Sequence, residues 1–212
     1  MHDLLSKNSR GNMQHQNEVD QRFWIIKTTV GAHGRSYWPD FWDNKVVAVG
    51  WGWINVDPSK AHNKTELYKP ITQQRPKLST NEQEYIARIV YKFTKVWNSG
   101  DKAIICRGYT STQAADVHLY GIATVGKFLY RPESEWWLFQ READIERIER
   151  DIPKHIFVDS LNLETSRLTI HQITEEGFKD FNKKIPDSNG FCGQARNPPM
   201  EAETRRFCNQ LS

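Results

Sequence analysis

The sequence lacks the long apolar segments and the cysteine-rich spacing that mark membrane proteins and disulfide-stabilised domains. No apolar run approaches the roughly 18–20 residues that a transmembrane helix needs, and the opening residues contain no apolar core of a signal peptide. The three cysteines, Cys106, Cys192 and Cys208, form neither a disulfide framework nor a zinc-binding spacing. We therefore expect a soluble cytoplasmic protein with reduced thiols, in which Cys106 is a small buried apolar residue.

The familiar enzyme motifs are also missing. The sequence contains no phosphate loop in which Gly-x-x-x-x-Gly-Lys is followed by Ser or Thr, no Gly-x-Ser-x-Gly and no His-Glu-x-x-His. The histidines are scattered without metal-ligand spacing, and the carboxylates of residues 142–151 alternate with arginines, as on a solvated charged surface. We expect no catalytic residue, no metal, no cofactor and no enzymatic activity of this chain alone.

Charge is modest, and tryptophan is abundant. The formal net charge is +3, which permits an anionic partner but is low for a protein that holds nucleic acid by phosphate attraction alone. Eight tryptophans are present, crowded between Trp24 and Trp53 and again at Trp136 and Trp137. An indole stacks well on a base or a cation, and it is equally a large core residue. The sequence leaves both interpretations open for each tryptophan.

The first half of the chain predicts two strands, one aromatic loop and one helix. Residues 22–29 and 45–54 are β-branched and aromatic, as strands are, and the second contains two glycines beside Trp51 and Trp53. Gly, Pro and an Asp-Asn pair favour turns, so we expect residues 31–44 to form a loop with exposed aromatic residues. Residues 57–77 are expected to be loop with one short helix at most. Ser79 and Glu82 form a capping box that begins a helix with apolar residues at helical spacing as far as Trp97.

The second half predicts further strands and a closing helix. Strands are expected at 101–107, at 118–130 with a bend at Gly126, and at 136–139, 156–158 and 168–171, whereas 141–153 is either a helical turn or an extended edge. Thr174 caps a last helix. The chain therefore divides into a mobile tail (1–21), one α+β domain (22–185), and a linker or the start of a following module (186–212).

Binding chemistry is better represented than catalysis. A planar base needs aromatic faces above and below it, and stacking contributes about 1–3 kcal/mol per base. Taking a base out of a duplex costs a few kcal/mol, so an aromatic pocket can offset extrusion. Trp51 and Trp53, with Trp38 or Trp42, are candidates for the walls. The candidate phosphate-binding residues are Lys27, Arg35, Lys45, Arg107 and Lys127.

The order of these segments resembles a known group. Their succession is similar to that in PUA-like domains of the EVE and YTH kind. The segments are, in order, FWIIKTT, VVAVGWGWI, a capped helix, NSGDKAIICRG and LYGIATVGKFLY. The likeness covers roughly residues 22–160 and is strongest to the base-reading modules at the front of modification-dependent restriction proteins of the McrB type. It implies a small β-barrel flanked by helices, with a flipped modified base in an aromatic cage at the mouth of the barrel.

The resemblance also implies site residues. The strand end Ile26-Lys27-Thr28 would contact the base edge through its backbone, although Thr28 stands where a Ser is usual. Trp51 would form one wall, and Trp53 or a loop tryptophan another. The full set of expected base-binding residues is Trp24, Thr28, Trp38, Trp42, Trp51 and Trp53.

We therefore expect a module that recognises a modified base in duplex DNA, as the specificity part of a restriction system with a fused or separate nuclease or motor. A reader of methylated RNA is the nearest alternative. A second is a peptide-docking module that uses the aromatic residues 36–42. A third is an enzyme acting on a base, which requires an ionisable group such as Asp43, Asp57 or Asp116 inside the cage.

Overall fold

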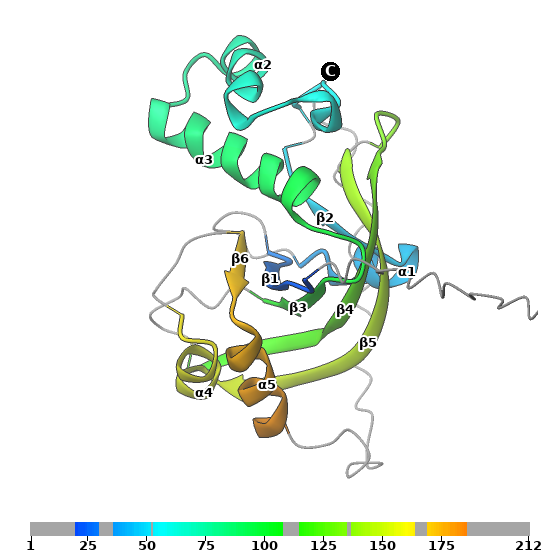
Figure 1. Ribbon diagram of the computed structural model, residues 1–212, viewed down its shortest axis with the longest axis vertical. Coiled ribbons are helices and arrows are strands. Elements are labelled where there is room, and N and C mark those ends of the chain that lie inside the picture. Colours follow the sequence, from blue (N-terminus) through cyan, green and yellow to red (C-terminus); the bar gives the residue numbers. More distant parts are fainter. Residues whose placement is uncertain are drawn as a thin grey trace, which may run out of the picture.

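The computed structural model describes residues 20–29, 36–51, 53–107, 115–134, 137–163 and 169–185. Within them, a curled, mixed, six-stranded sheet forms a half-barrel with flanking helices, which is an α+β architecture (Figure 1). The strand order is β2-β5-β4-β3-β1-β6. The strands are β1 (Phe23–Lys27), β2 (Val46–Val49), β3 (Lys102–Cys106), β4 (Asp116–Tyr130), β5 (Phe139–Pro153) and β6 (Ile170–Ile173).

Strand pairing is antiparallel except between β1 and β3, which run parallel with Ile25 opposite Ile104. The long β4–β5 pair carries two shifts of register, one beside Gly121 and one beside Gly126. A Cβ at Gly121 would stand 2.3 Å from the carbonyl oxygen of Glu146, so only glycine allows this close approach. The irregularity that the sequence predicts at Gly126 lies at the second shift.

Both faces of β1 are buried, and alternate residues of this strand face opposite sides of the sheet. Trp24 and Ile26 of β1 belong to one apolar cluster, and Phe23 and Ile25 belong to the other. Helices α1 (Trp38–Asn44) and α3 (Thr80–Tyr91) pack in the first cluster, whereas α4 (Lys154–Ser160) and α5 (Glu175–Lys184) pack in the second (Figure 1). Short helical segments Pro58–Lys60, Lys64–Leu67 and α2 (Tyr68–Gln74) connect β2 to α3.

Helix α3 begins as the sequence predicts. The Ser79 amide donates to Glu82 Oε2 at 2.8 Å, and the Glu82 amide donates to Ser79 Oγ at 3.3 Å, which completes the capping box. The helix continues into a π-helical turn, Lys92–Val96, and Trp97 follows. The Gly100-Asp101 turn then leads into β3.

Asp101 and Arg141 anchor the chain around this turn. Asp101 is buried, and its Oδ2 accepts from Trp24 Nε1 at 2.8 Å. Arg141 on β5 is buried as well, and burial lowers the pKa of its guanidinium to about 10. It donates to four carbonyl oxygens at 2.7–3.0 Å, those of Phe93, Thr94, Trp97 and Gly126. The carbonyls at the end of the π-helical turn are thereby satisfied.

Four predictions about secondary structure are wrong. Residues 38–44 of the expected loop form α1, because Pro39 suits a first helical turn and the Trp38, Phe41 and Trp42 rings gather on one face. The expected strand 45–54 ends at Val49, and Trp51 and Trp53 lie in the segment that follows the strand. Residues 156–158 lie in α4 rather than in a strand. Of the described residues in the expected strand 136–139, only Phe139 belongs to a strand, at the start of β5.

Other predictions are confirmed. The charged segment 141–153 is extended and lies within β5, between β2 and β4. Thr174 caps α5, with its Oγ1 accepting from the Gly177 amide at 3.0 Å. Cys106 is fully buried. In contrast, residues 57–77 contain three short helical segments, whereas the sequence predicts one at most. The predicted tails, apart from residues 20 and 21, lie outside the described residues.

Candidate functional site

The turn that follows β2 presents two indole rings. Trp51 has a φ of 72°, in the left-handed region, which is exceptional for so bulky a residue. The Ile54 amide donates to the Trp51 carbonyl at 2.8 Å, and the Ile54 side chain is fully buried. Trp51 and Trp53 are both partly exposed beside the core. The core thus anchors the turn at Ile54 and leaves both indoles accessible.

Tyr85 of α3 connects this turn to the end of β1. Its ring lies edge-on to that of Trp51, with centroids 6.0 Å apart. Its hydroxyl lies 3.0 Å from Thr169 Oγ1 and accepts from the Thr169 amide at 3.0 Å. The Thr169 carbonyl in turn accepts from the Lys27 amide at 3.0 Å. A continuous series of contacts therefore runs from Trp51 to the end of β1 at Lys27, where the sequence predicts contacts to the base edge.

A cavity of about 470 Å³ opens beside these rings. That volume lies within the range of small-molecule sites. The Arg75 guanidinium stands over the Trp53 ring at 5.3 Å from its centroid, so the cavity combines aromatic surface with one cation and one carboxylate. The lining residues are Trp51, Trp53, Arg75, Leu78, Glu82, Tyr85 and Ile86. This set can stack on a planar ligand and form hydrogen bonds to its edge.

The structure does not bring Trp24 or Trp38 to this cavity. Trp24 has no exposed surface and stacks on Trp97 at 5.1 Å between centroids, so it is a core residue that a ligand cannot reach. Trp38 is buried against Tyr120 at 5.1 Å and donates through Nε1 to Glu149 at 2.5 Å. Neither tryptophan can therefore act as a base-binding residue as predicted, because both indole rings are packed against other side chains of the core.

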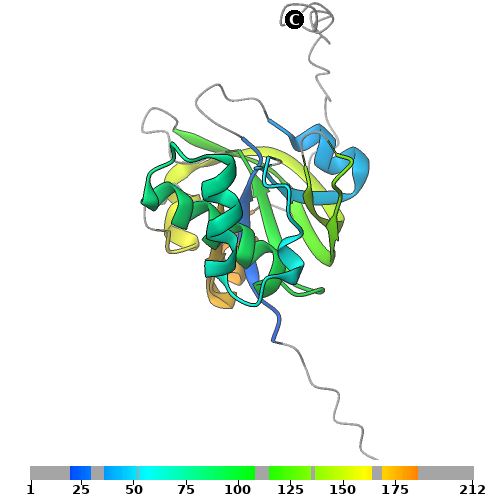
Figure 2. The ribbon, with the colours of Figure 1, turned by 90° about the horizontal axis from the view of Figure 1, so that it is seen from above.

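Trp42 belongs to a separate group on α1. The Lys45 ammonium lies 3.6 Å from its ring centroid, and the Arg147 guanidinium lies 5.4 Å from it. Figure 2 shows α1 (blue) set apart from α3 (green), and Trp42 is not among the residues that line the cavity. Trp42 therefore does not share a wall with Trp51 and Trp53.

Thr28 is buried at the end of β1. Its amide donates to the Cys106 carbonyl, its carbonyl accepts from the Tyr37 amide, and its Oγ1 lies 3.1 Å from Ser36 Oγ. The backbone of Thr28 is thus already hydrogen-bonded within the protein, and it stabilises the junction between β1 and α1.

The predicted phosphate contacts are dispersed. Lys27 is only 8% exposed, and burial lowers the pKa of its ammonium to about 8, so it is not a surface cation. Lys127 pairs with Glu142 at 3.1 Å, and Lys45 covers Trp42. Arg107 is exposed, and Arg35 lies outside the described residues. Arg75 was missed, because an arginine in a polar stretch carries no pattern that sets it apart.

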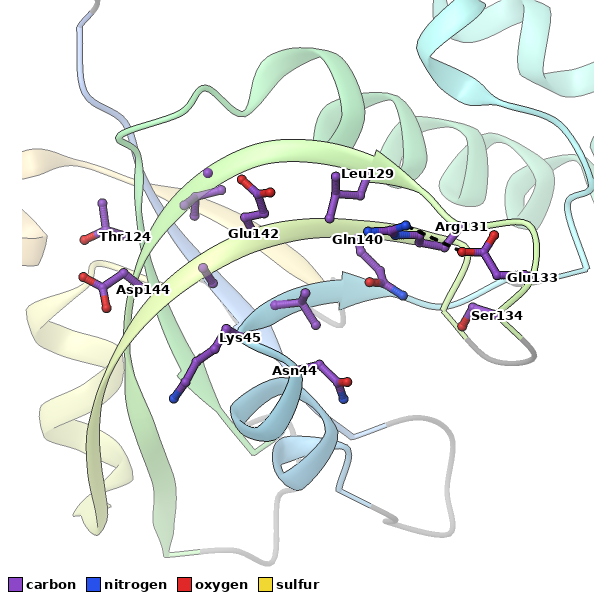
Figure 3. Close-up of a pocket in the computed structure, with 14 residues that line it drawn as sticks. Asn44, Lys45, Thr124, Leu129, Arg131, Glu133, Ser134, Gln140, Glu142 and Asp144 are labelled. Carbon is purple, nitrogen blue, oxygen red and sulfur yellow. Dashed lines mark ion pairs between the residues drawn. The ribbon is translucent and has the colours of Figure 1, made fainter.

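A second groove, of about 740 Å³, lies elsewhere and has a different character (Figure 3). It runs along β4 and β5 beside Lys45, and none of the described residues that line it is aromatic. Charged pairs occupy part of its wall, including Arg131 with Glu133 at 3.7 Å. The described lining of this groove therefore offers no aromatic face for stacking on a base. The cavity beside Trp51 is the smaller site with the more suitable chemistry.

The three aspartates named for the enzymatic alternative do not lie at the cavity, although another carboxylate, that of Glu82, lines it. None of Asp43, Asp57 and Asp116 lines the cavity of Trp51, and the Asp57 carboxylate accepts from the Ser59 amide at 2.9 Å. No group of three or more His, Cys, Asp or Glu residues in the described part of the chain could hold a metal ion. Residues 121–127 have the glycine and lysine spacing of a phosphate loop, but they lie within β4 and Phe128 follows them. No helix among the described residues is long and apolar enough to cross a membrane.

Comparisons with known proteins do not assign the chain to a family. No family model matches the sequence, and no curated protein matches it. Among solved structures, the chain is similar to the crystal structure of protein Atu2648 from Agrobacterium tumefaciens, with 13% sequence identity. That similarity covers 78% of this chain and 99% of the other, at a TM-score of 0.35.

Proposed function

We propose that this domain is a PUA-like module that recognises a modified base in DNA by taking it out of the duplex into the cavity beside Trp51 and Trp53. The observation that carries the proposal is Trp51 itself. A bulky residue with a φ of 72° costs about 1–3 kcal/mol, and such strain persists where the surrounding structure enforces it, often at a binding site. Here the strained residue presents an indole at the edge of a cavity.

The composition of the cavity supports a base as its ligand. Trp51, Trp53 and Tyr85 provide aromatic surface, and Leu78 and Ile86 provide an apolar floor. Each stacked base gains about 1–3 kcal/mol, which is comparable to the cost of extrusion from a duplex. Contacts made only to the modified base then determine whether that base lies in the cavity or stays stacked in the duplex. As in the restriction proteins that the sequence resembles, a separate or fused nuclease or motor would use this recognition.

A fluorescence experiment tests base extrusion. A duplex carrying 2-aminopurine beside a modified base becomes brighter when the stack opens, because stacking quenches 2-aminopurine. We expect an increase on addition of the protein for the duplex with the recognised modification, and none for the Trp51→Ala variant. An increase of equal size with that variant would show that the cavity beside Trp51 does not take the base.

A further inference from the structure

Another aromatic cavity, of about 260 Å³, lies beside α1 and takes no part in the proposed base recognition. Tyr37, Phe41 and Trp137 line it. The Trp137 ring meets the Tyr37 ring at 88° with 4.5 Å between centroids, and the Phe41 ring at 70° with 5.7 Å. Because a planar base stacks on faces parallel to its own, walls that stand nearly at right angles enclose a compact, rounded group better than a flat one.

The polar groups of this cavity are acceptors. Asp40 lines the cavity and is half-buried, and within the described residues no ion pair or hydrogen bond engages its carboxylate. The side-chain amides of Asn44 and Gln140 donate to the carbonyls of Asp40 and Trp137, at 2.8 and 2.7 Å, which leaves their own oxygens as acceptors. The described lining contains neither lysine nor arginine. The cavity therefore combines aromatic faces with a negative charge, which suits a cation.

The face of Trp137 is available to such a cation. The ring of Trp42, on the same side of the domain, already carries the cationic groups of Lys45 and Arg147, whereas among the described residues no cationic side chain lies over Trp137. An unmodified lysine ammonium is compact and strongly hydrated. Methylation keeps its charge and adds apolar surface, and aromatic cages recognise ammonium groups of this kind.

The cavity adjoins the groove of about 740 Å³, since Asn44, Val46, Ser134 and Gln140 line both. Figure 3 shows Asn44 at the end of α1, Gln140 on β5 and Ser134 in the connection between β4 and β5. Carboxylates outnumber cations in the described lining of the groove as well. A chain that inserts one side chain into the cavity therefore has a groove of suitable charge to lie in.

We propose that this cavity binds the alkylated ammonium group of a methylated lysine in a peptide, with Tyr37 and Trp137 as walls and Asp40 as the counter-ion. The groove takes the peptide on either side of that lysine. Peptide docking by the aromatic residues 36–42, which the sequence leaves open as an alternative, would then be a second function of the domain. It uses a cavity separate from that of Trp51 and does not depend on base recognition.

Calorimetric titration of the full chain with a short peptide that carries one trimethyllysine tests the site. Comparison peptides carry unmodified lysine or a neutral analogue in which a tert-butyl group replaces the trimethylammonium group. We expect the trimethyllysine peptide to bind at least about tenfold more tightly than either, because the analogue has the shape without the charge and lysine holds its water more strongly. Choline supplies the same cation without a peptide and should bind at least about tenfold more weakly, because it makes no contacts in the groove.

Two variants isolate the charge and the ring. Asp40→Asn keeps the shape of the side chain, so affinity for the trimethyllysine peptide should fall about fivefold or more, while affinity for the neutral analogue stays the same. Asp43→Asn is the matched control, because Asp43 is an exposed carboxylate of α1 that does not line the cavity, and it should keep full affinity. Trp137→Ala should abolish the preference for the cation over its neutral analogue, and thermal melting of each variant checks that the fold is kept.

The contrary outcomes are distinct. Equal affinity for the trimethylammonium and tert-butyl peptides would show an apolar pocket and overturn the cation site. Full affinity in both Asp40→Asn and Trp137→Ala would place binding elsewhere and overturn the assignment to this cavity. Choline that binds as tightly as the peptide would assign the cavity to a free organic cation and overturn the assignment to lysine. Base recognition is tested separately, by modified duplexes, and none of these outcomes decides it.

Discussion

The Tyr85 ring meets the Trp51 ring edge to face, with an interplanar angle of 79° and 6.0 Å between centroids. This contact joins the middle of α3 to a turn that lies more than thirty residues earlier in the chain. The Tyr85 hydroxyl bonds Thr169, so the same side chain also holds the segment before β6. One tyrosine therefore fixes both the wall of the cavity and its attachment to the sheet.

Substitution of Trp51 should separate binding from folding. Trp51→Ala removes an exposed stacking surface, so affinity for the modified duplex should fall about tenfold or more. The variant should still unfold cooperatively, because Trp51 is half-exposed. Equilibrium titration and thermal melting measure the two effects.

Trp24→Ala is the matched control for Trp51→Ala. Trp24 is fully buried and donates to Asp101, so its truncation should cost about 3–5 kcal/mol of unfolding free energy. Denaturant unfolding measures this loss. If Trp51→Ala destabilised the protein as much as Trp24→Ala, Trp51 would be a core residue and the cavity would be misplaced.

Loss of the Tyr85 hydroxyl should affect the site more than the fold. Tyr85→Phe keeps the ring beside Trp51 but removes the acceptor for the Thr169 amide. We expect a loss of about 1 kcal/mol in stability, typical of one hydrogen bond, together with weaker binding of the modified duplex. Unchanged binding would show that Thr169 need not be held for the cavity to function.

Arg141→Met should be among the most destabilising single substitutions. Methionine fills similar space but leaves four buried carbonyl oxygens without their donor. Since an unsatisfied buried group costs about 1–3 kcal/mol, we expect a loss of at least about 3 kcal/mol in urea unfolding. Arg88→Met, on an exposed position of α3, should change stability by less than about 0.5 kcal/mol. A similar effect of both variants would contradict the anchoring role of Arg141.

Stability should rise with pH between about pH 7 and 9. Burial lowers the pKa of Lys27 from 10.5 to about 8, so in this range the unfolded chain binds more protons than the folded one. The gain should be about 1 kcal/mol and should be absent in Lys27→Met. Above pH 9 burial of Cys106, which raises its pKa from 9.0 to about 12, acts in the opposite direction. Unfolding free energies at several pH values check the slope, and an equal slope in Lys27→Met would contradict it.

Local patterns in the sequence predicted much of the fold. The capping box located α3, and runs of apolar, β-branched and aromatic residues located β1, β3 and β4. Helix α1 was missed because it has only seven residues and contains Pro39, so its pattern is too short to distinguish from a loop. The end of β2 was missed because Gly50 permits either a bulge or a turn.

The site was less predictable, since it depends on contacts between distant residues. The glycines beside Trp51 and Trp53 distinguish these two residues in the sequence. No local pattern shows that Trp24 and Trp38 are buried in the core, as the structure has them. Tyr85 meets Thr169 across a separation of 84 residues, which no local pattern encodes. Glu82 was recognised as a helix cap, but its place at the cavity depends on how α3 packs against the turn after β2.

A binding titration tests base recognition most directly. Short duplexes carrying N6-methyladenine, 5-methylcytosine, 5-hydroxymethylcytosine or no modification are titrated with the protein at about 0.05 M and about 0.2 M salt. The proposed function predicts tight binding to one modified duplex, weakened modestly by salt. Weak, equal and strongly salt-dependent binding to all four duplexes would show that the protein is attracted only to phosphates. That result would contradict the proposed function.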